Sequence, residues 1–201
     1  MIRIIRNAAV AAVVMGSSAC SLLATPEPVQ LYRFGGTATA ASSDRATTPV
    51  EVSLRRVEFP QAVAGDRLLG MTGTEAAYIA GARWVGPARG LYSEALEAAF
   101  GEGATRVRLI GQRETTPAAK LLDIDVQAFE ARYDAPRRNP VIVVAVRARL
   151  LNPDRTIASE RLFQSAVPAR ENRVSAIVTA FDTAVADVNG EIVDWTDANA
   201  G

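Results

Sequence analysis

Histidine is absent from all 201 residues of the chain, and cysteine occurs once, as Cys20. Catalysis by Ser-His-Asp or Cys-His groups needs an imidazole base, and histidine-containing zinc sites need an imidazole ligand, so these classes are excluded. A single cysteine also excludes an intramolecular disulfide, which leaves apolar burial to stabilise the fold. We therefore predict a protein that is not an enzyme and that holds no metal or other cofactor.

An excess of charge of one sign is missing as well, because 22 Lys and Arg residues stand against 22 Asp and Glu residues. Two of the arginines, Arg3 and Arg6, belong to the N-terminal segment, so the chain from Cys20 onward carries 20 basic and 22 acidic side chains. Such a balance produces no positive field for the phosphate backbone of a nucleic acid. We expect no nucleic-acid partner.

The N-terminal segment has the layout of a secretory signal peptide. Arg3 and Arg6 precede the apolar residues 8–15, and the small residues 16–19 follow. The apolar run is far shorter than the roughly 20 residues that are needed to span a bilayer. We predict that residues 1–19 are a signal peptide that is removed on export.

Cys20 follows these small residues directly, an arrangement that resembles a bacterial lipobox. The resemblance implies that Cys20 becomes the N-terminus, carries acyl chains such as palmitate, and begins a lipidated tether over residues 20–29. Ser17 departs from the pattern, because Leu or Val usually stands three residues before the cysteine. Ser17 and Ala19 also fit ordinary cleavage, which would release a soluble periplasmic protein, and a free buried cysteine is a third alternative. The fit to an export signal favours lipid attachment at Cys20.

Residues 30–201 are predicted to form one domain in which strands dominate. Apolar and polar residues alternate over residues 121–133 and 141–151, which predicts two strands joined as a hairpin. The alternation changes phase near Ala128, which predicts a bulge. Further strands are predicted at residues 30–34, 50–59, 106–110 and 156–167, with two more inside 66–85.

Two segments have helical periodicity instead. Apolar residues recur at helical spacing over about 87–100 and 172–197, with Pro87 in a first turn, Asn172 as an N-cap and residues 101–103 as a glycine stop. The order of elements predicts an α+β fold, with a single mixed or antiparallel sheet and the two helices packed on it. Covering this sheet is the expected role of the long C-terminal helix, although its apolar stripe could also dock a partner.

Two carboxylates lie on one face of a predicted strand, and they could serve in acid–base catalysis or bind calcium. Arg147 and Arg149 have the same spacing on the next strand as Asp123 and Asp125. If the hairpin closes as predicted, Asp125 faces Arg147 and Asp123 faces Arg149. We therefore favour a solvated ladder of opposite charges, in which each pair contributes about 0.2–1 kcal/mol.

Aromatic side chains and arginine are favoured at protein interfaces, and both occur in the segment from Tyr78 to Trp84. We predict that Tyr78, Arg83 and Trp84 lie beside a surface for a partner or for self-association. A core position for Trp84 is equally open, because burial is the common fate of a large aromatic side chain.

Several short matches, in their order and spacing, resemble one known family. They are Leu31-Tyr32-x-Phe34, Tyr78 with Arg83-Trp84, a helix with Leu91 and Leu96, Leu122-x-Ile124-x-Val126 with Phe129-Glu130, Arg161-x-Phe163, and Ala180-Phe181 with a late Trp195. With the leader, they resemble the ABC-type transport auxiliary lipoproteins, the group that contains the paraquat-inducible protein C lipoproteins. The likeness runs over nearly the whole mature chain.

The resemblance implies a lipoprotein of the outer membrane of a Gram-negative bacterium, facing the periplasm. It would act by binding, as an auxiliary component of an ABC transporter that moves lipids between the inner and outer membranes. The implied partners are separate chains: a mammalian-cell-entry (MCE) substrate-binding protein, an ABC permease and its ATPase, and further copies in a homo-oligomer. Ser21 follows Cys20 where an Asp would signal retention in the inner membrane. Two alternatives stay open: an assembly lipoprotein that binds an outer-membrane partner without lipid transport, and a secreted enzyme that uses carboxylates.

Overall fold

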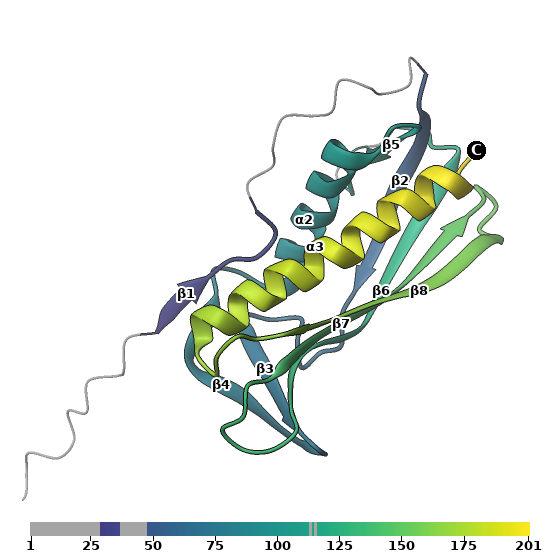
Figure 1. Ribbon diagram of the computed structural model, residues 1–201. Helices are drawn as coiled ribbons and strands as arrows, with labels where there is room; N and C mark the ends of the chain where they lie inside the picture. The colour runs from purple at the N-terminus through teal and green to yellow at the C-terminus, as the bar shows by residue number, and fades with distance from the viewer. Residues whose placement is uncertain (1–28, 37–47, 113, 115) are drawn as a thin grey trace, which may run out of the picture.

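The computed structural model describes residues 29–36, 48–112, 114 and 116–201, so the predicted signal peptide, Cys20 and the tether up to residue 28 lie outside the described part. Within it the chain forms eight strands and two helices (Figure 1). In chain order they are β1 (Gln30–Tyr32), β2 (Val50–Glu58), β3 (Arg67–Thr72), β4 (Glu75–Trp84), α2 (Ala88–Gly103), β5 (Val107–Ile110), β6 (Lys120–Tyr133), β7 (Val141–Leu151), β8 (Ile157–Pro168) and α3 (Val174–Asn199). The predicted α+β fold is confirmed.

The eight strands form one mixed sheet that branches at β6. On one side, β6 pairs antiparallel with β7, and β7 pairs antiparallel with β8. On its other side, β6 pairs in parallel with β2 along its first residues and in parallel with β3 along its last ones. β5 extends the β2 branch, and β4 followed by β1 extends the β3 branch. The sheet therefore ends at β8 on one side and at β5 and β1 on the other.

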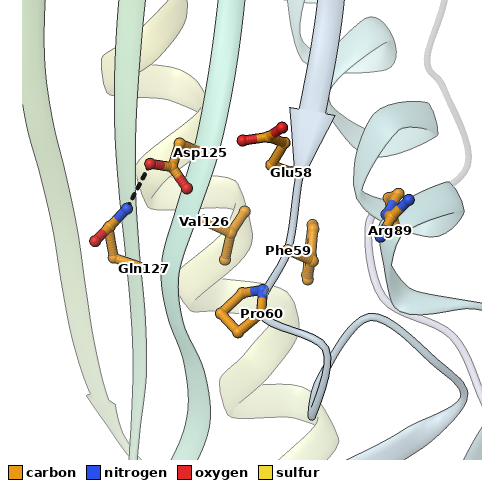
Figure 2. Close-up of a pocket in the computed structure, with 7 residues that line it drawn as sticks. All are labelled: Glu58, Phe59, Pro60, Arg89, Asp125, Val126 and Gln127. Carbon is orange, nitrogen blue, oxygen red and sulfur yellow. Dashed lines mark hydrogen bonds between the residues drawn. The ribbon is translucent and has the colours of Figure 1, made fainter.

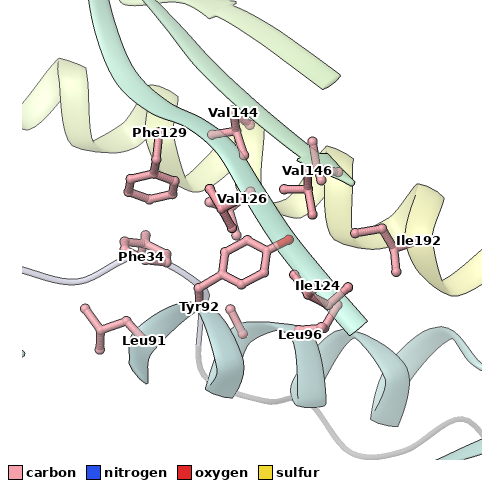
Figure 3. Packing of buried hydrophobic residues seen from close by; sticks show 14 of the residues in the cluster. Phe34, Leu91, Tyr92, Leu96, Ile124, Val126, Phe129, Val144, Val146 and Ile192 are labelled. Atoms are coloured by element: carbon pink, nitrogen blue, oxygen red, sulfur yellow. The ribbon is translucent and has the colours of Figure 1, made fainter. Parts of the chain in front are cut away.

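Both helices lie on the same face of this sheet, with α3 running along β7 and β8 and α2 beside it (Figure 1). Tyr92 and Leu96 of α2 point toward Ile124 and Val126 of β6, and Ile192 of α3 lies near them (Figure 3). All five side chains are at most 1% exposed. The core is thus a single layer between the helices and the sheet.

The hairpin of β6 and β7 has the register that the sequence predicts. Leu122, Ile124 and Val126 face the helices, and the register shifts between Val126 and Ala128. After the shift, Phe129 and Ala131 are the buried residues. The predicted bulge is therefore confirmed, and it keeps the core face apolar when the alternation changes phase.

The ends of α2 differ from the prediction of 87–100. Pro87 is the N-cap and precedes the first turn, and the helix continues to Gly103 through the residues predicted to stop it. Gly103 packs close to α3, because a Cβ built there would lie 3.4 Å from a methyl group of Val193.

The long C-terminal helix also begins later than predicted. Arg173 is its N-cap, without a side-chain hydrogen bond, and α3 extends from Val174 to Asn199 instead of over 172–197. Asn172 was predicted as the cap, but its side-chain oxygen accepts a hydrogen bond from the Tyr133 hydroxyl, at 3.4 Å. The apolar stripe of α3 covers the sheet as expected. Neither described helix is both long enough and apolar enough to cross a membrane.

Candidate functional site

Trp84 is a core residue, which is one of the two alternatives that the sequence leaves open. Its side chain is 2% exposed and makes T-shaped contacts with Phe34 and Phe181, with ring centroids 4.9 Å and 5.4 Å apart. No residue in the described part of the chain accepts a hydrogen bond from its indole N–H. Trp84 therefore stabilises the fold and does not itself line a surface.

Tyr78, in contrast, lies at the surface on β4, with 38% of the residue exposed. Its hydroxyl donates a hydrogen bond to the carbonyl oxygen of Ala62, at 3.1 Å. The guanidinium carbon of Arg67 lies 3.8 Å from the centroid of the Tyr78 ring, a cation–π contact. These two contacts hold the ring in place while leaving part of it open.

Arg83 also points away from the core, because side chains alternate along a strand and its neighbours Ala82 and Trp84 are buried. It forms an ion pair with Asp66, with 2.9 Å between the nearest nitrogen and oxygen. The register of the sheet places Arg83 opposite Arg67, the residue that stacks on Tyr78. Tyr78 and Arg83 are therefore close to each other on the side of the sheet that the helices leave open.

Three apolar residues beside them were missed by the sequence analysis. Leu31 is the register partner of Arg83 and is 59% exposed, and Val29 and Val85 are 48% and 50% exposed. With Tyr78 they make up four of the six large apolar residues that are exposed in the described part of the chain. We call the group of Val29, Leu31, Tyr78, Arg83 and Val85 the β1/β4 corner.

The pairing that assembles this corner is long-range. β1 and the last residues of β4 run parallel, so residues 30–32 lie beside residues 82–84. The alternation around Leu31 predicts a strand, but no local pattern shows which strand lies next to it. The other two exposed apolar residues, Ile157 and Leu162, lie on β8, the opposite end of the sheet.

The predicted ladder of opposite charges has the expected register but different ion pairs. Asp123 lies opposite Arg149 and Asp125 opposite Arg147, as predicted. However, Asp123 is only 4% exposed, and its carboxylate accepts hydrogen bonds from two nitrogens of Arg55, with the Nε atom at 2.7 Å. The hydrogen bond with Asp123 raises the pKa of Arg55 above its ordinary value. The prediction of a solvated pair is therefore wrong for Asp123, because the parallel strand β2 brings Arg55 beside it.

The second half of the ladder is closer to the prediction. Asp125 lies 3.9 Å from Arg149 and accepts a hydrogen bond from Gln127 at 2.7 Å. Arg149 in turn has a shorter ion pair, at 2.7 Å, with Glu160 of β8. These charges form a surface network across three strands.

A hollow of about 420 Å³ opens beside Asp125, where β2 leaves β6 at the branch of the sheet (Figure 2). Glu58 and Asp125 are register partners there, and Glu58 has an ion pair with Arg56 at 3.0 Å. Both carboxylates are engaged by neighbouring side chains. In the described residues, no group of three or more His, Cys, Asp or Glu side chains is placed to hold a metal ion.

Two solved structures share this fold. A crystal structure of a protein from Xanthomonas campestris matches 85% of this chain and 96% of its own length, with a TM-score of 0.70 and 23% identity. A hypothetical protein from Chlamydia trachomatis matches 77% of this chain and 98% of its own, with a TM-score of 0.50 and 12% identity. At these identities the likeness shows the fold alone.

The family is shown by the sequence itself. No curated protein is significantly similar to the chain. The sequence pattern of the ABC-type transport auxiliary lipoprotein component matches residues 32–193, from β1 to the penultimate turns of α3. The chain therefore belongs to the family of ABC-type transport auxiliary lipoprotein components, as the resemblance implied.

Proposed function

We propose that this chain is a lipid-anchored, periplasmic auxiliary component of an MCE-linked ABC system that transports lipids between the inner and outer membranes. It acts by binding, while the permease and the ATPase are separate chains. The observation that carries the proposal is the β1/β4 corner, an exposed apolar and aromatic surface on a chain of the transport auxiliary family. The balanced charge and the absence of histidine agree with a binding role.

The domains follow from this proposal. Residues 1–19 direct export and are removed, Cys20 carries the lipid, and residues 30–201 form the folded domain. The tether from Cys20 to Val29 reaches about 30 Å when fully extended. Because it enters the fold at β1, the β1/β4 corner lies within that reach of the outer-membrane surface.

The partner surface is the β1/β4 corner. Interfaces favour aromatic residues and arginine, and a few such residues usually contribute most of the binding energy. Arg67 and the carbonyl of Ala62 already hold the Tyr78 ring in place. Binding of a partner should therefore cost little conformational entropy at this side chain. The proposed occupant is the MCE-domain protein or a second copy of this chain.

Membrane fractionation tests the anchor. Cys20→Ala should move the protein from the outer-membrane fraction to the soluble periplasmic fraction and abolish palmitate labelling. Several acyl chains anchor a protein stably, whereas one chain binds only marginally. A wild-type protein that is soluble and unlabelled would contradict the anchor and leave the soluble alternative.

Co-purification tests the partner surface. Tyr78→Ala combined with Leu31→Ser should abolish co-purification with an MCE-domain protein from the same cells, and the melting temperature should change little because both residues lie at the surface. Leu162→Ser, on the opposite end of the sheet, is the matched control and should retain the partner. If both variants bind alike, the corner is not the surface. If an outer-membrane protein is lost in place of the MCE protein, the chain is an assembly lipoprotein.

A further inference from the structure

β8 forms one edge of the sheet and is a long strand with a single neighbour (Figure 1). It extends over 12 residues, from Ile157 to Pro168, and in the described part of the chain it pairs with β7 alone. The strands at the other end of the sheet, β1 and β5, have only three and four residues. A free strand edge presents a row of unpaired amides and carbonyls that can pair with another strand. Among the described strands, β8 offers the longest such edge.

One backbone hydrogen bond shows which residues of β8 face outward. The amide of Ala169 donates to the carbonyl oxygen of Pro140 at 2.9 Å, in continuation of the antiparallel register of β7 and β8. Bonded and non-bonded pairs alternate in such a register, so the odd-numbered residues from 161 to 167 bond to β7. The residues between them turn their amide and carbonyl groups away from β7: Glu160, Leu162, Gln164 and Ala166. Pro168 also faces outward, where its missing N–H breaks no bond.

The usual protection of a free edge is confined to the ends of β8 or turned inward. Natural sheets protect their edges with bulges, prolines and charged side chains. On β8, the register shift against β7 lies at the first residues and Pro168 is the last residue. The two charges in the middle have ion pairs within the chain, Glu160 with Arg149 at 2.7 Å and Arg161 with Glu191 at 3.9 Å. The middle of the edge is therefore regular and open.

We propose that β8 pairs antiparallel with β8 of a second copy of this chain, about a two-fold axis at Leu162. The Leu162 residue is 53% exposed, and in this register it meets its own copy. Glu160 of each copy lies opposite Gln164 of the other, and the outward-facing residues exchange both N–H···O bonds with the residue opposite. A second β8 matches this edge in length. The contact lies at the opposite end of the sheet from the β1/β4 corner and does not depend on the proposed function.

The neighbouring registers are less favourable because of the residues that they oppose. A two-fold axis at Glu160 or at Arg161 would place like charges opposite each other, which destabilises a strand pair. An axis one residue beyond Leu162 would place this leucine opposite the polar side chain of Gln164. An axis at Gln164 would bring Pro168 into the pairing at an outward-facing position, and proline has no amide to donate. The axis at Leu162 avoids all three costs.

Disulfide formation tests the register. Cys20→Ala leaves the chain without a cysteine, so Leu162→Cys in that background introduces a single one. Opposite residues of a bonded antiparallel pair have Cα atoms about 5.5 Å apart, which a disulfide can span. We expect mild oxidation to give a disulfide-linked dimer. Gln164→Cys in the same background is equally exposed on the edge but lies opposite Glu160, and should cross-link at least about tenfold more slowly. Equal rates in the two variants would overturn the proposal.

Sedimentation equilibrium of the Cys20→Ala chain tests the dimer without a cross-link. We expect a mass twice that of one chain. Leu162→Lys should raise the dissociation constant at least about tenfold, because two like charges then meet at the axis. Val85→Lys makes the same change at an exposed residue of the β1/β4 corner and should leave the dimer intact. A chain that stays monomeric, or a dimer that Val85→Lys breaks and Leu162→Lys does not, would overturn the proposal.

Discussion

The two faces of the sheet are stabilised in different ways, although the same strands supply both. On the helix-covered face, Leu122, Ile124 and Val126 are at most 1% exposed and belong to one apolar core. On the open face, the alternating residues Asp123 and Asp125 are paired with arginines from β2 and β7. The two helices pack on the other face of the sheet (Figure 1). Alternate residues of the same strand therefore lie in two environments, the apolar core on one face and a charged surface on the other.

The difference shows where change is tolerated. Full burial of a large apolar side chain contributes about 1.5–3 kcal/mol. An exposed ion pair contributes about 0–1 kcal/mol. The covered face therefore contributes most of the stability, and substitutions of exposed residues on the open face and at the β1/β4 corner should cost little. Asp123 is the exception on the open face, because it is a buried charge with an obligatory partner.

Trp84→Ala should disrupt the packing on the helix-covered face and have the largest effect on stability. The indole contacts Phe34, Phe129 and Phe181, so its removal leaves a cavity in the aromatic cluster. The free energy of unfolding should fall by about 3–5 kcal/mol, as measured by denaturant unfolding. Tyr78→Ala, on the same strand but partly exposed, is the control; it loses one hydrogen bond and one cation–π contact at the surface and should lower it by only about 1–2 kcal/mol. Equal effects in the two variants would contradict the assignment of Trp84 to the core.

Asp123→Asn should sharpen the contrast within the open face. It leaves Arg55 without its charged partner and should lower the free energy of unfolding by about 2 kcal/mol. Asp125→Asn is matched in chemistry and lies two residues away, but its carboxylate is more exposed, so its effect should stay below about 1 kcal/mol. Urea denaturation of both variants at one pH makes the comparison. Equal losses would show that burial of Asp123 is not what distinguishes them.

Asp197 makes polar contacts on the helix-covered side of the sheet. Its substitution should lower the free energy of unfolding by less than the two changes above. Burial alone raises the pKa of Asp197, but hydrogen bonds from the Thr105 amide and hydroxyl and from the amides of Arg106 and Val107 outweigh it, so the pKa lies below the ordinary value of 3.8. The folded state then binds fewer protons than the unfolded state near that value. The stabilisation is therefore present above pH 3.8 and is lost as the pH falls through the lowered folded pKa.

Asp197→Asn should lower the free energy of unfolding by about 1 kcal/mol at pH 7, because the amide oxygen still accepts some of these bonds. The variant should also lose less stability than the wild type when the pH falls from 5 to 2, roughly the range of titration of a carboxylate. Denaturant midpoints measured across that range provide the test. A parallel fall in both proteins would show that Asp197 does not carry this pH dependence.

Several features were predictable because they depend on local periodicity. Alternation over β6 and β7 predicts the hairpin, its register and the bulge near Ala128, and helical spacing predicts α3 and its buried stripe. Because the apolar face of each strand must lie on the core side, the pattern also favours the register that places Asp123 opposite Arg149. The ion pair of Asp123 was not predictable, because it comes from β2, far away in the chain.

The sequence by itself determined the class of the fold, the apolar face of each long element and the resemblance to the transport auxiliary family. Only the tertiary structure decided that Trp84 is buried, that Leu31 and Val85 meet Arg83 at the surface, and that α2 continues through its glycines against α3. The physical reason is that a local pattern shows which face of an element is apolar, whereas the neighbour of that face depends on chain segments far apart in the sequence. The β1/β4 corner arises from such long-range packing.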